Sequence, residues 1–174
     1  MVPPVRTRPP RGVTLIELLS LVLLTGSFGT LALPQFTASL QSFRLNGAAR
    51  KIVADLRQAQ SLAIAQGGLY RFHSGNDPGA GHPDQYRLEQ STNGGTTWSE
   101  VTPWYTLASD FQGVSVFSVQ DSAGSPVPVY EVQFNSRGAC ANCPGLTTPI
   151  VIAVSSPAGT RAIQVRSAGS VSIP

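Results

Sequence analysis

The feature that most constrains this chain is an apolar run near its start, residues 13–33, in which Glu17 is the only charged residue. As a helix rising ~1.5 Å per residue, the run would be about 31 Å long, which matches the hydrocarbon core of a bilayer. A carboxylate inside a membrane helix costs about 3 kcal/mol, so it needs a partner of opposite charge. The sequence therefore predicts a membrane-spanning helix carrying one acid that awaits a partner.

The basic residues are divided unevenly between this run and the rest of the chain. Arg6, Arg8 and Arg11 precede the run, and no further Lys or Arg occurs until Arg44. This asymmetry predicts an N-terminus in the cytoplasm and a body on the other side of the membrane. The same three arginines account for the formal net charge of +3, because beyond residue 12 the basic and acidic residues balance.

Two simpler interpretations of the segment leave Glu17 unexplained. A cleaved signal peptide has an apolar region of about 7–15 residues and ends at an A-x-A-like site. Here the run is longer, and its best pair of small residues, Thr30 and Ala32, matches poorly. A plain membrane anchor has no use for an acid in its span.

The stretch from Arg11 to Leu19, RGVTLIELL, resembles the prepilin signature of type IV pilins and type II secretion pseudopilins. The resemblance implies that a prepilin peptidase removes a leader, residues 1–12, by cutting between Gly12 and Val13, and then methylates the new N-terminus of Val13. It also implies that Glu17 is the family's glutamate and Pro34 its helix-bending proline. Val13 departs from the family, which usually has Phe at this position.

Cleavage would create an α-ammonium group at Val13, and this group can pair with Glu17 of a neighbouring chain when helices pack side by side. Such a pair would be desolvated, so removing either half should strongly destabilise the assembly. The implied partners are the peptidase, other pilin or pseudopilin subunits and an inner-membrane assembly platform. The implied location is the bacterial inner membrane, single-pass with the body in the periplasm, and then the pilus or pseudopilus.

Residues 14–66 predict one long helix, which Gly67 and Gly68 end. Beyond the apolar run the helix carries two opposed apolar stripes, which predicts that one packs on its own domain and the other on neighbouring subunits. The first stripe consists of Phe36, Leu40 and Phe43. The second consists of Leu45, Ala49, Ile52, Leu56, Ala59 and Ala63.

The remainder predicts short strands separated by glycine- and proline-rich turns. The expected strands are 69–73, 85–90, 114–119, 129–134, 150–154 in the centre of a sheet, and a closing hairpin of 162–166 and 170–173. The fold class is therefore α+β and pilin-like, a long helix packed on an antiparallel β-rich domain. The expected parts are the leader 1–12, a transmembrane and filament-core helix 13–33, an amphipathic continuation 34–66 and a globular domain 67–174.

Scattered positions of this body also resemble GspH/FimT-type minor pilins. They are ADLRQAQSLAIAQG at 54–67, VQFNSRG at 132–138 and RAIQVRSAGSVSIP at 161–174. The resemblance implies a minor pilin or pseudopilin, a structural or priming subunit of a type IV pilus or a type II secretion system.

The two cysteines, Cys140 and Cys143, form a C-x-x-C motif in a loop that follows a strand. A redox motif of the thioredoxin type would sit at a helix start beside a βαβ unit, so a local disulfide is the better interpretation. Two cysteines alone cannot make a four-ligand zinc site. Asp77 and Asp84 lie in a loop without D-x-D-x-D spacing, which favours a solvated turn over a calcium site. The sequence thus indicates no metal and no cofactor.

Nothing in the sequence points to an enzyme, since His73 and His82 lie in no catalytic pattern. The densest basic patch contains Arg44, Arg50 and Lys51, and it suggests an alternative function as a DNA-binding minor pilin for natural transformation. Phosphate binding needs several clustered cations, and the balanced charge beyond residue 12 weakens this alternative. Nucleic acid is therefore the less favoured partner.

Overall fold

The computed structural model describes residues 12–121, 130–143, 145 and 148–174. Gly12 is thus the one residue of the expected leader that it describes; Arg6, Arg8 and Arg11 lie outside. The chain divides into two compact units, Met1–Ser39 and Leu40–Pro174. The long helix α1, Leu15–Gln66, contributes to both units.

The part of α1 in the first unit is uninterrupted from Leu15 to Ser39, although Gly26 and Pro34 lie within it. Within the described residues, no helix has a stretch that is long and apolar enough to cross a membrane. The single helix expected over residues 14–66 is confirmed, whereas the membrane span expected over 13–33 stays a prediction.

The end of α1 has a clear local cause. Gly67 follows the last helical residue with a φ of 66°. This left-handed conformation ends helices, and glycine adopts it without the steric penalty of a Cβ. The expected stop at Gly67 is confirmed.

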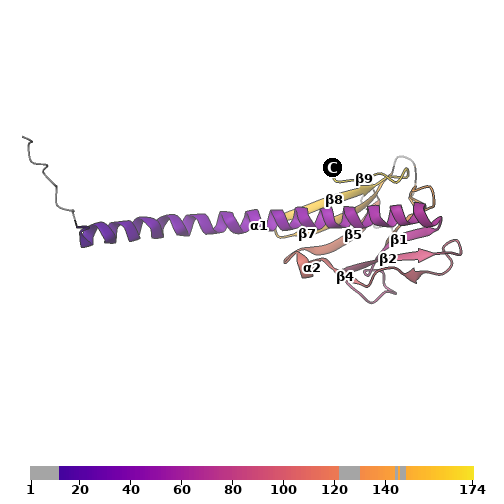
Figure 1. Ribbon diagram of the computed structural model, residues 1–174, viewed down its shortest axis with the longest axis horizontal. Helices are drawn as coiled ribbons and strands as arrows, with labels where there is room; N and C mark the ends of the chain where they lie inside the picture. Colours follow the sequence, from indigo (N-terminus) through magenta and orange to yellow (C-terminus); the bar gives the residue numbers. More distant parts are fainter. Residues whose placement is uncertain (1–11, 122–129, 144, 146–147) are drawn as a thin grey trace, which may run out of the picture. The chain divides into compact units, whose positions relative to one another are not determined.

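Two antiparallel sheets complete the second unit (Figure 1). The first sheet has the order β3-β2-β1-β6, with β4 also paired to β2. Its strands are β1 Leu69–Ser74, β2 Gln85–Ser91, β3 Ser99–Glu100, β4 Tyr105–Thr106 and β6 Glu131–Phe134. The second sheet has the order β5-β7-β8-β9. Its strands are β5 Ser115–Asp121, β7 Ile150–Ser156, β8 Gly159–Val165 and β9 Val171–Ser172. A short helix, α2 Leu107–Asp110, connects β4 to β5.

The second apolar stripe of α1 packs into the core of this unit. Its six residues are at most 3% exposed. Figure 1 shows β8 and β9 on one side of this part of α1 and β2 and β4 on the other. The core is completed by alternate residues of both sheets, which include Tyr70, Phe72, Leu88, Val132, Phe134, Ile152, Val154 and Ile163. The expected packing of this stripe on its own domain is confirmed.

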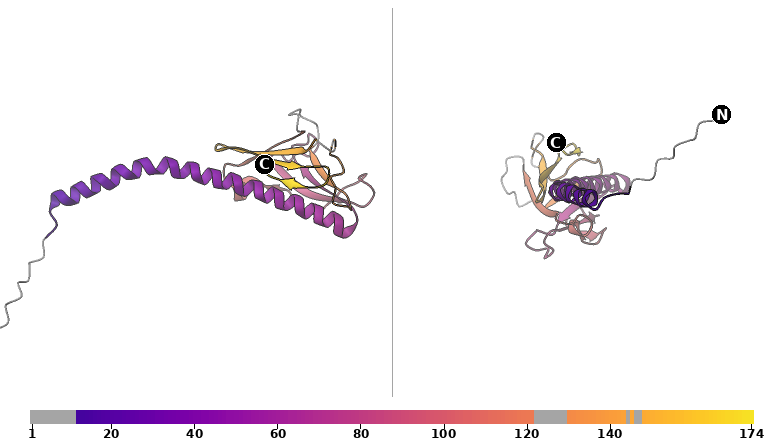
Figure 2. Two further views of the ribbon diagram at one scale, coloured as in Figure 1. Left: turned by 90° about the horizontal axis from the view of Figure 1, so that it is seen from above. Right: turned by 90° about the vertical axis from the view of Figure 1, so that its left-hand side faces the viewer.

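The predicted strands are found with small differences at their ends. β7 lies between β5 and β8, and β8 pairs with β9, so the central strand and the closing hairpin are confirmed. β8 begins three residues earlier than predicted, at Gly159. Residues 159–161 are exposed, so they carry no alternating pattern that could announce the strand. The views in Figure 2 show the strands of the two sheets beside the C-terminal part of α1.

Candidate functional site

The site built by the N-terminal residues begins at the expected cleavage position. Gly12 precedes the helix, has no regular secondary structure and is exposed. A Cβ at Gly12 would meet no atom within 4 Å. The next residue, Val13, is 68% exposed. In the described chain, the peptide bond between them is therefore open to an enzyme.

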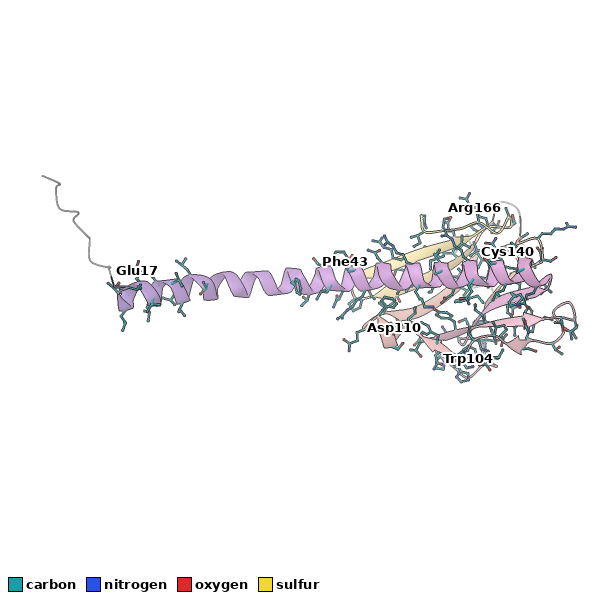
Figure 3. The ribbon with its side chains drawn as sticks, in the orientation of Figure 1. Glu17, Phe43, Trp104, Asp110, Cys140 and Arg166 are labelled. Carbon is teal, nitrogen blue, oxygen red and sulfur yellow. A yellow bond between two sulfur atoms is a disulfide. The ribbon has the colours of Figure 1, made fainter. Side chains whose placement is uncertain are left out.

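Glu17 lies in the first turn of α1, near the N-terminal end of the helix (Figure 3). Thr14 precedes the helix, and its hydroxyl oxygen accepts a hydrogen bond from the Glu17 N–H at 3.4 Å. The T-x-x-E spacing is that of a capping box, which the sequence analysis did not recognise. A carboxylate here is also favoured by the positive end of the helix dipole. Among the described residues, no cation forms an ion pair with Glu17.

The surface around Glu17 is apolar on every side of the helix. The exposed residues are Val13, Leu15, Ile16, Leu18, Leu19, Leu21, Val22, Leu23 and Leu24, each 56–81% exposed. A helix that is apolar all round is normally buried among other helices or in lipid. This segment therefore requires a covering that the described chain does not supply to it.

The hydroxyl groups of this segment turn back onto the helix itself. Ser20 donates to the Glu17 carbonyl at 2.9 Å and Thr25 donates to the Leu21 carbonyl at 2.9 Å. Because such hydroxyls are satisfied by carbonyls three or four residues earlier, they do not oppose burial in an apolar environment. Glu17 is the exception, since its charge cannot be satisfied in this way.

The other apolar stripe of α1 is exposed as well. Phe36 is 64% exposed, Leu40 37% and Phe43 74%. Phe43 lies where the helix enters the second unit (Figure 3). The stripe that was expected to meet neighbouring subunits is therefore free of the chain's own core.

The predicted basic patch is not a free cluster of cations. The Lys51 ammonium pairs with the Asp55 carboxylate at 2.6 Å and lies 5.0 Å from the centre of the Tyr105 ring. Asp55 also accepts a hydrogen bond from the Tyr86 hydroxyl at 2.6 Å. Burial raises the pKa of Tyr86, and the bond to Asp55 raises this pKa further. Of the three predicted residues, only Arg50 is exposed; Arg44 is half-buried.

The cysteine, histidine and aspartate residues of the loops serve local roles. Cys140 and Cys143 form a disulfide with Cα atoms 5.6 Å apart. The His82 ring stacks on Trp104, with 4.5 Å between ring centres. Asp77 accepts a hydrogen bond from the Gly79 N–H at 3.2 Å. In the described ranges, no three His, Cys, Asp or Glu residues are grouped to hold a metal ion.

A charged network on the first sheet is the feature that sequence reasoning missed. Glu89 of β2 is 1% exposed, and the Arg71 guanidinium of β1 pairs with it at 2.5 Å. Arg71 also pairs with Glu131 of β6. Burial alone would raise the pKa of Glu89, but the nearby His73 ring, whose Nδ1 lies 3.3 Å from the carboxylate, and the Arg71 guanidinium lower it to about 2. The cross-strand register, in which Arg71 lies opposite Glu89, is the signal that could have revealed the network.

The class of fold is defined by these parts together. A long helix begins with an exposed apolar segment, and its later turns pack on antiparallel sheets. This is the pilin-like fold. The sequence predicts a resemblance to minor pilins and pseudopilins, and comparison with known proteins confirms it.

The chain is similar in structure to the type IV minor pilin FimU of Pseudomonas aeruginosa, with a TM-score of 0.50 and 18% identity. The match covers 75% of this chain and 92% of FimU. The chain is also similar in structure to the minor pseudopilin EpsH from the type 2 secretion system of Vibrio cholerae, with a TM-score of 0.52 and 14% identity. This match covers 75% of this chain and 96% of EpsH. In sequence, the chain is 38% identical over 69 residues to type II secretion system protein H of Xanthomonas campestris pv. campestris. This match covers 40% of the chain and only 41% of that relative. No model of a known protein family matches the chain.

Proposed function

We propose that this protein is a minor pilin or pseudopilin, a structural or priming subunit of a type IV pilus or a type II secretion pseudopilus. The observation that carries the proposal is the apolar segment at the start of α1, exposed on all sides, with one carboxylate in its first turn that has no ion-pair partner among the described residues. Similarity in fold to minor pilins and pseudopilins supports it. The protein acts by assembly and not as an enzyme.

Processing precedes assembly in this proposal. Prepilin peptidase removes residues 1–12 by cutting between Gly12 and Val13, and methylates the new N-terminus. The exposure of both residues and the lack of regular structure at Gly12 support access by the peptidase. Before assembly the chain spans the inner membrane through residues 13–33, with its N-terminus in the cytoplasm and its body in the periplasm.

Assembly then covers the apolar segment with the helices of other subunits, guided by the inner-membrane platform. The α-ammonium of Val13 in one subunit pairs with Glu17 of the next, because each charge is otherwise left unpaired in an apolar environment. If a helix docked one helical turn out of place along its neighbour, the two charges would be separated. The pair therefore fixes the register between the two helices. Pro34 lets the helix bend, and Phe36, Leu40 and Phe43 extend the contact along it.

The test uses the full chain, expressed together with a prepilin peptidase and its pilus or secretion machinery. The mature protein should begin at Val13, carry one N-terminal methyl group and be found in the filament fraction. Glu17→Ala should be processed normally but be missing from filaments. A mature chain that still begins at Met1, or that starts near residue 33, would contradict the proposal.

DNA binding is the alternative function, and the contacts of the basic residues weigh against it. Lys51 is neutralised by Asp55, which leaves Arg44 and Arg50 as the remaining members of the predicted patch. Phosphate-driven binding requires several cations that act together. Salt-dependent binding of duplex DNA by the full chain, lost in an Arg44→Ala/Arg50→Ala variant, would restore this alternative.

A further inference from the structure

Strand β6 lies at the edge of the first sheet, where its outward backbone groups would be open to pairing with another strand. On one side it pairs with β1. Its other side is covered by the loop that contains the two cysteines. Exposed strand edges are templates for unwanted pairing between chains, and proteins commonly cover them.

The loop binds three outward backbone groups of β6 and one group just beyond the end of the strand. The Ala141 N–H donates to the Gln133 carbonyl at 2.8 Å. The side chain of Asn142 accepts from the Gln133 N–H at 2.9 Å and donates to the Glu131 carbonyl at 2.9 Å. The Asn135 N–H donates to the Ala139 carbonyl at 3.0 Å. The loop thus takes the place of a neighbouring strand.

The disulfide encloses the two residues that make most of these bonds. Ala141 and Asn142 are the two residues between Cys140 and Cys143 in the sequence. A disulfide across so short a loop adds little to global stability by chain entropy. Its main effect is therefore local: it restricts the backbone of the two residues that cover β6.

The covered edge is also tied to the rest of the second unit. The Cys140 N–H donates to the Ser167 carbonyl, in the turn after β8, at 3.0 Å. Figure 3 shows Cys140 near Arg166, the first residue of that turn. From α1, the Gln60 amide donates to the carbonyls of Gly138 and Gly169 at 2.7 and 3.0 Å. The start of the loop is held from two elements, whereas Ala141 and Asn142 are held by β6 and the disulfide.

We propose that the disulfide-closed loop, residues 139–143, is an edge cap that prevents β6 from pairing with β6 of a second copy of the chain. The partner that the cap excludes is a second copy of the chain, because two identical strand edges can pair with each other in an antiparallel arrangement. The cap opens when a dithiol reduces the disulfide. The dithiol gives two electrons and becomes a disulfide, the S–S bond breaks, and the two cysteine sulfurs take up two protons. Without the cap, pairing of copies through β6 would compete with contacts of the same copies through their helices.

The experiment measures amide hydrogen exchange of the full chain in nonionic detergent micelles, with and without dithiothreitol. Reduction, or a Cys140→Ser/Cys143→Ser variant, should accelerate exchange at Gln133 and Asn135 by about tenfold or more, as expected for local opening. The Ile152 amide, in the centre of the second sheet, should keep its protection. Light scattering should then detect association of the reduced chain.

Two further variants separate the edge cap from general loss of structure. Asn142→Ala keeps the disulfide but removes two bonds to β6, so it should expose the Gln133 amide without reductant. Asn93→Ala removes side-chain bonds in the β2–β3 loop and should leave that amide protected. Gln133→Pro removes the outward N–H and should abolish association of the reduced chain. Unchanged exchange at Gln133 in the reduced chain, or a reduced chain that does not associate, would overturn the proposal.

Discussion

At the scale of single residues, Asp55 joins the helix to the first sheet. It is 8% exposed, and it binds both Lys51 of α1 and the hydroxyl of Tyr86 on β2. A buried carboxylate is tolerated only when cations and donors of this kind surround it. Asp55 therefore links α1 to β2 through Tyr86, and it also removes Lys51 from the set of free surface cations.

Tyr86→Phe should lower the free energy of unfolding by about 1–2 kcal/mol, since it leaves a buried carboxylate with one donor fewer. Tyr105→Phe is the matched control, because its hydroxyl bonds to the exposed Asp110. We expect the control to lose less than about 0.5 kcal/mol, as is usual for surface changes. Urea unfolding of the full chain in micelles measures both values. Equal losses of free energy in the two variants would show that the buried hydrogen bond contributes no more to stability than the exposed one.

Glu89 should make the body sensitive to acid. Its pKa falls from an ordinary 4.5 to about 2 on folding. Its ionised form therefore stabilises the fold fully above pH 4.5, and this contribution is lost as the pH falls towards 2. A lowering of this size corresponds to roughly 3 kcal/mol. The free energy of unfolding should therefore decrease steeply as the pH falls from 4.5 to 2.

The control for this prediction compares slopes instead of absolute stabilities. Glu89→Gln should flatten the loss of stability between pH 5 and 2, even if the variant is less stable throughout. Glu100→Gln should keep the steep dependence, because the Glu100 side chain is 53% exposed and lies 3.6 Å from Arg87. A dependence that persists in Glu89→Gln would assign the acid sensitivity to another group.

At the scale of elements, α1 carries two opposed stripes that meet different environments. Ile52 belongs to the buried stripe and is fully buried, whereas Phe43 belongs to the exposed stripe and is 74% exposed. The same apolar chemistry therefore stabilises the fold on one face and is left for other subunits on the opposite face. Substitutions on the two faces should separate stability from assembly.

Phe43→Ser should leave the free energy of unfolding within about 0.5 kcal/mol of the wild type, because the ring is exposed. The same variant should be depleted from filaments, since its side chain would be buried there. Ile52→Ala should instead lower stability by about 2–5 kcal/mol, which is typical of a buried Ile. Unfolding assays and immunoblots of sheared filaments measure the two effects. Normal incorporation of Phe43→Ser would remove this residue from the assembly surface.

At the scale of the whole molecule, the sequence predicted the long helix, its stop at Gly67 and the central strand β7, because each has a strong local signal. It did not predict β3, β4 or α2, which have two to four residues and so show no periodicity. The network around Glu89 and the covering of β6 depend on which strands become neighbours, and a single sequence does not state this directly. One signal was present but unused, the T-x-x-E cap at Thr14.

The capping role of Thr14 and the assembly role of Glu17 can be separated by experiment. Glu17→Gln should keep the cap, because glutamine also serves at this position of a capping box, but it removes the charge. If the charge pairs with the α-ammonium of a neighbour, this variant should be processed yet absent from filaments. Thr14→Ala is the converse control: it removes the cap, costs about 1 kcal/mol of helix stability and keeps the charge, so filaments should still form. Quantifying both chains in sheared filaments decides the matter, since a pure capping role requires that Thr14→Ala fail and Glu17→Gln assemble.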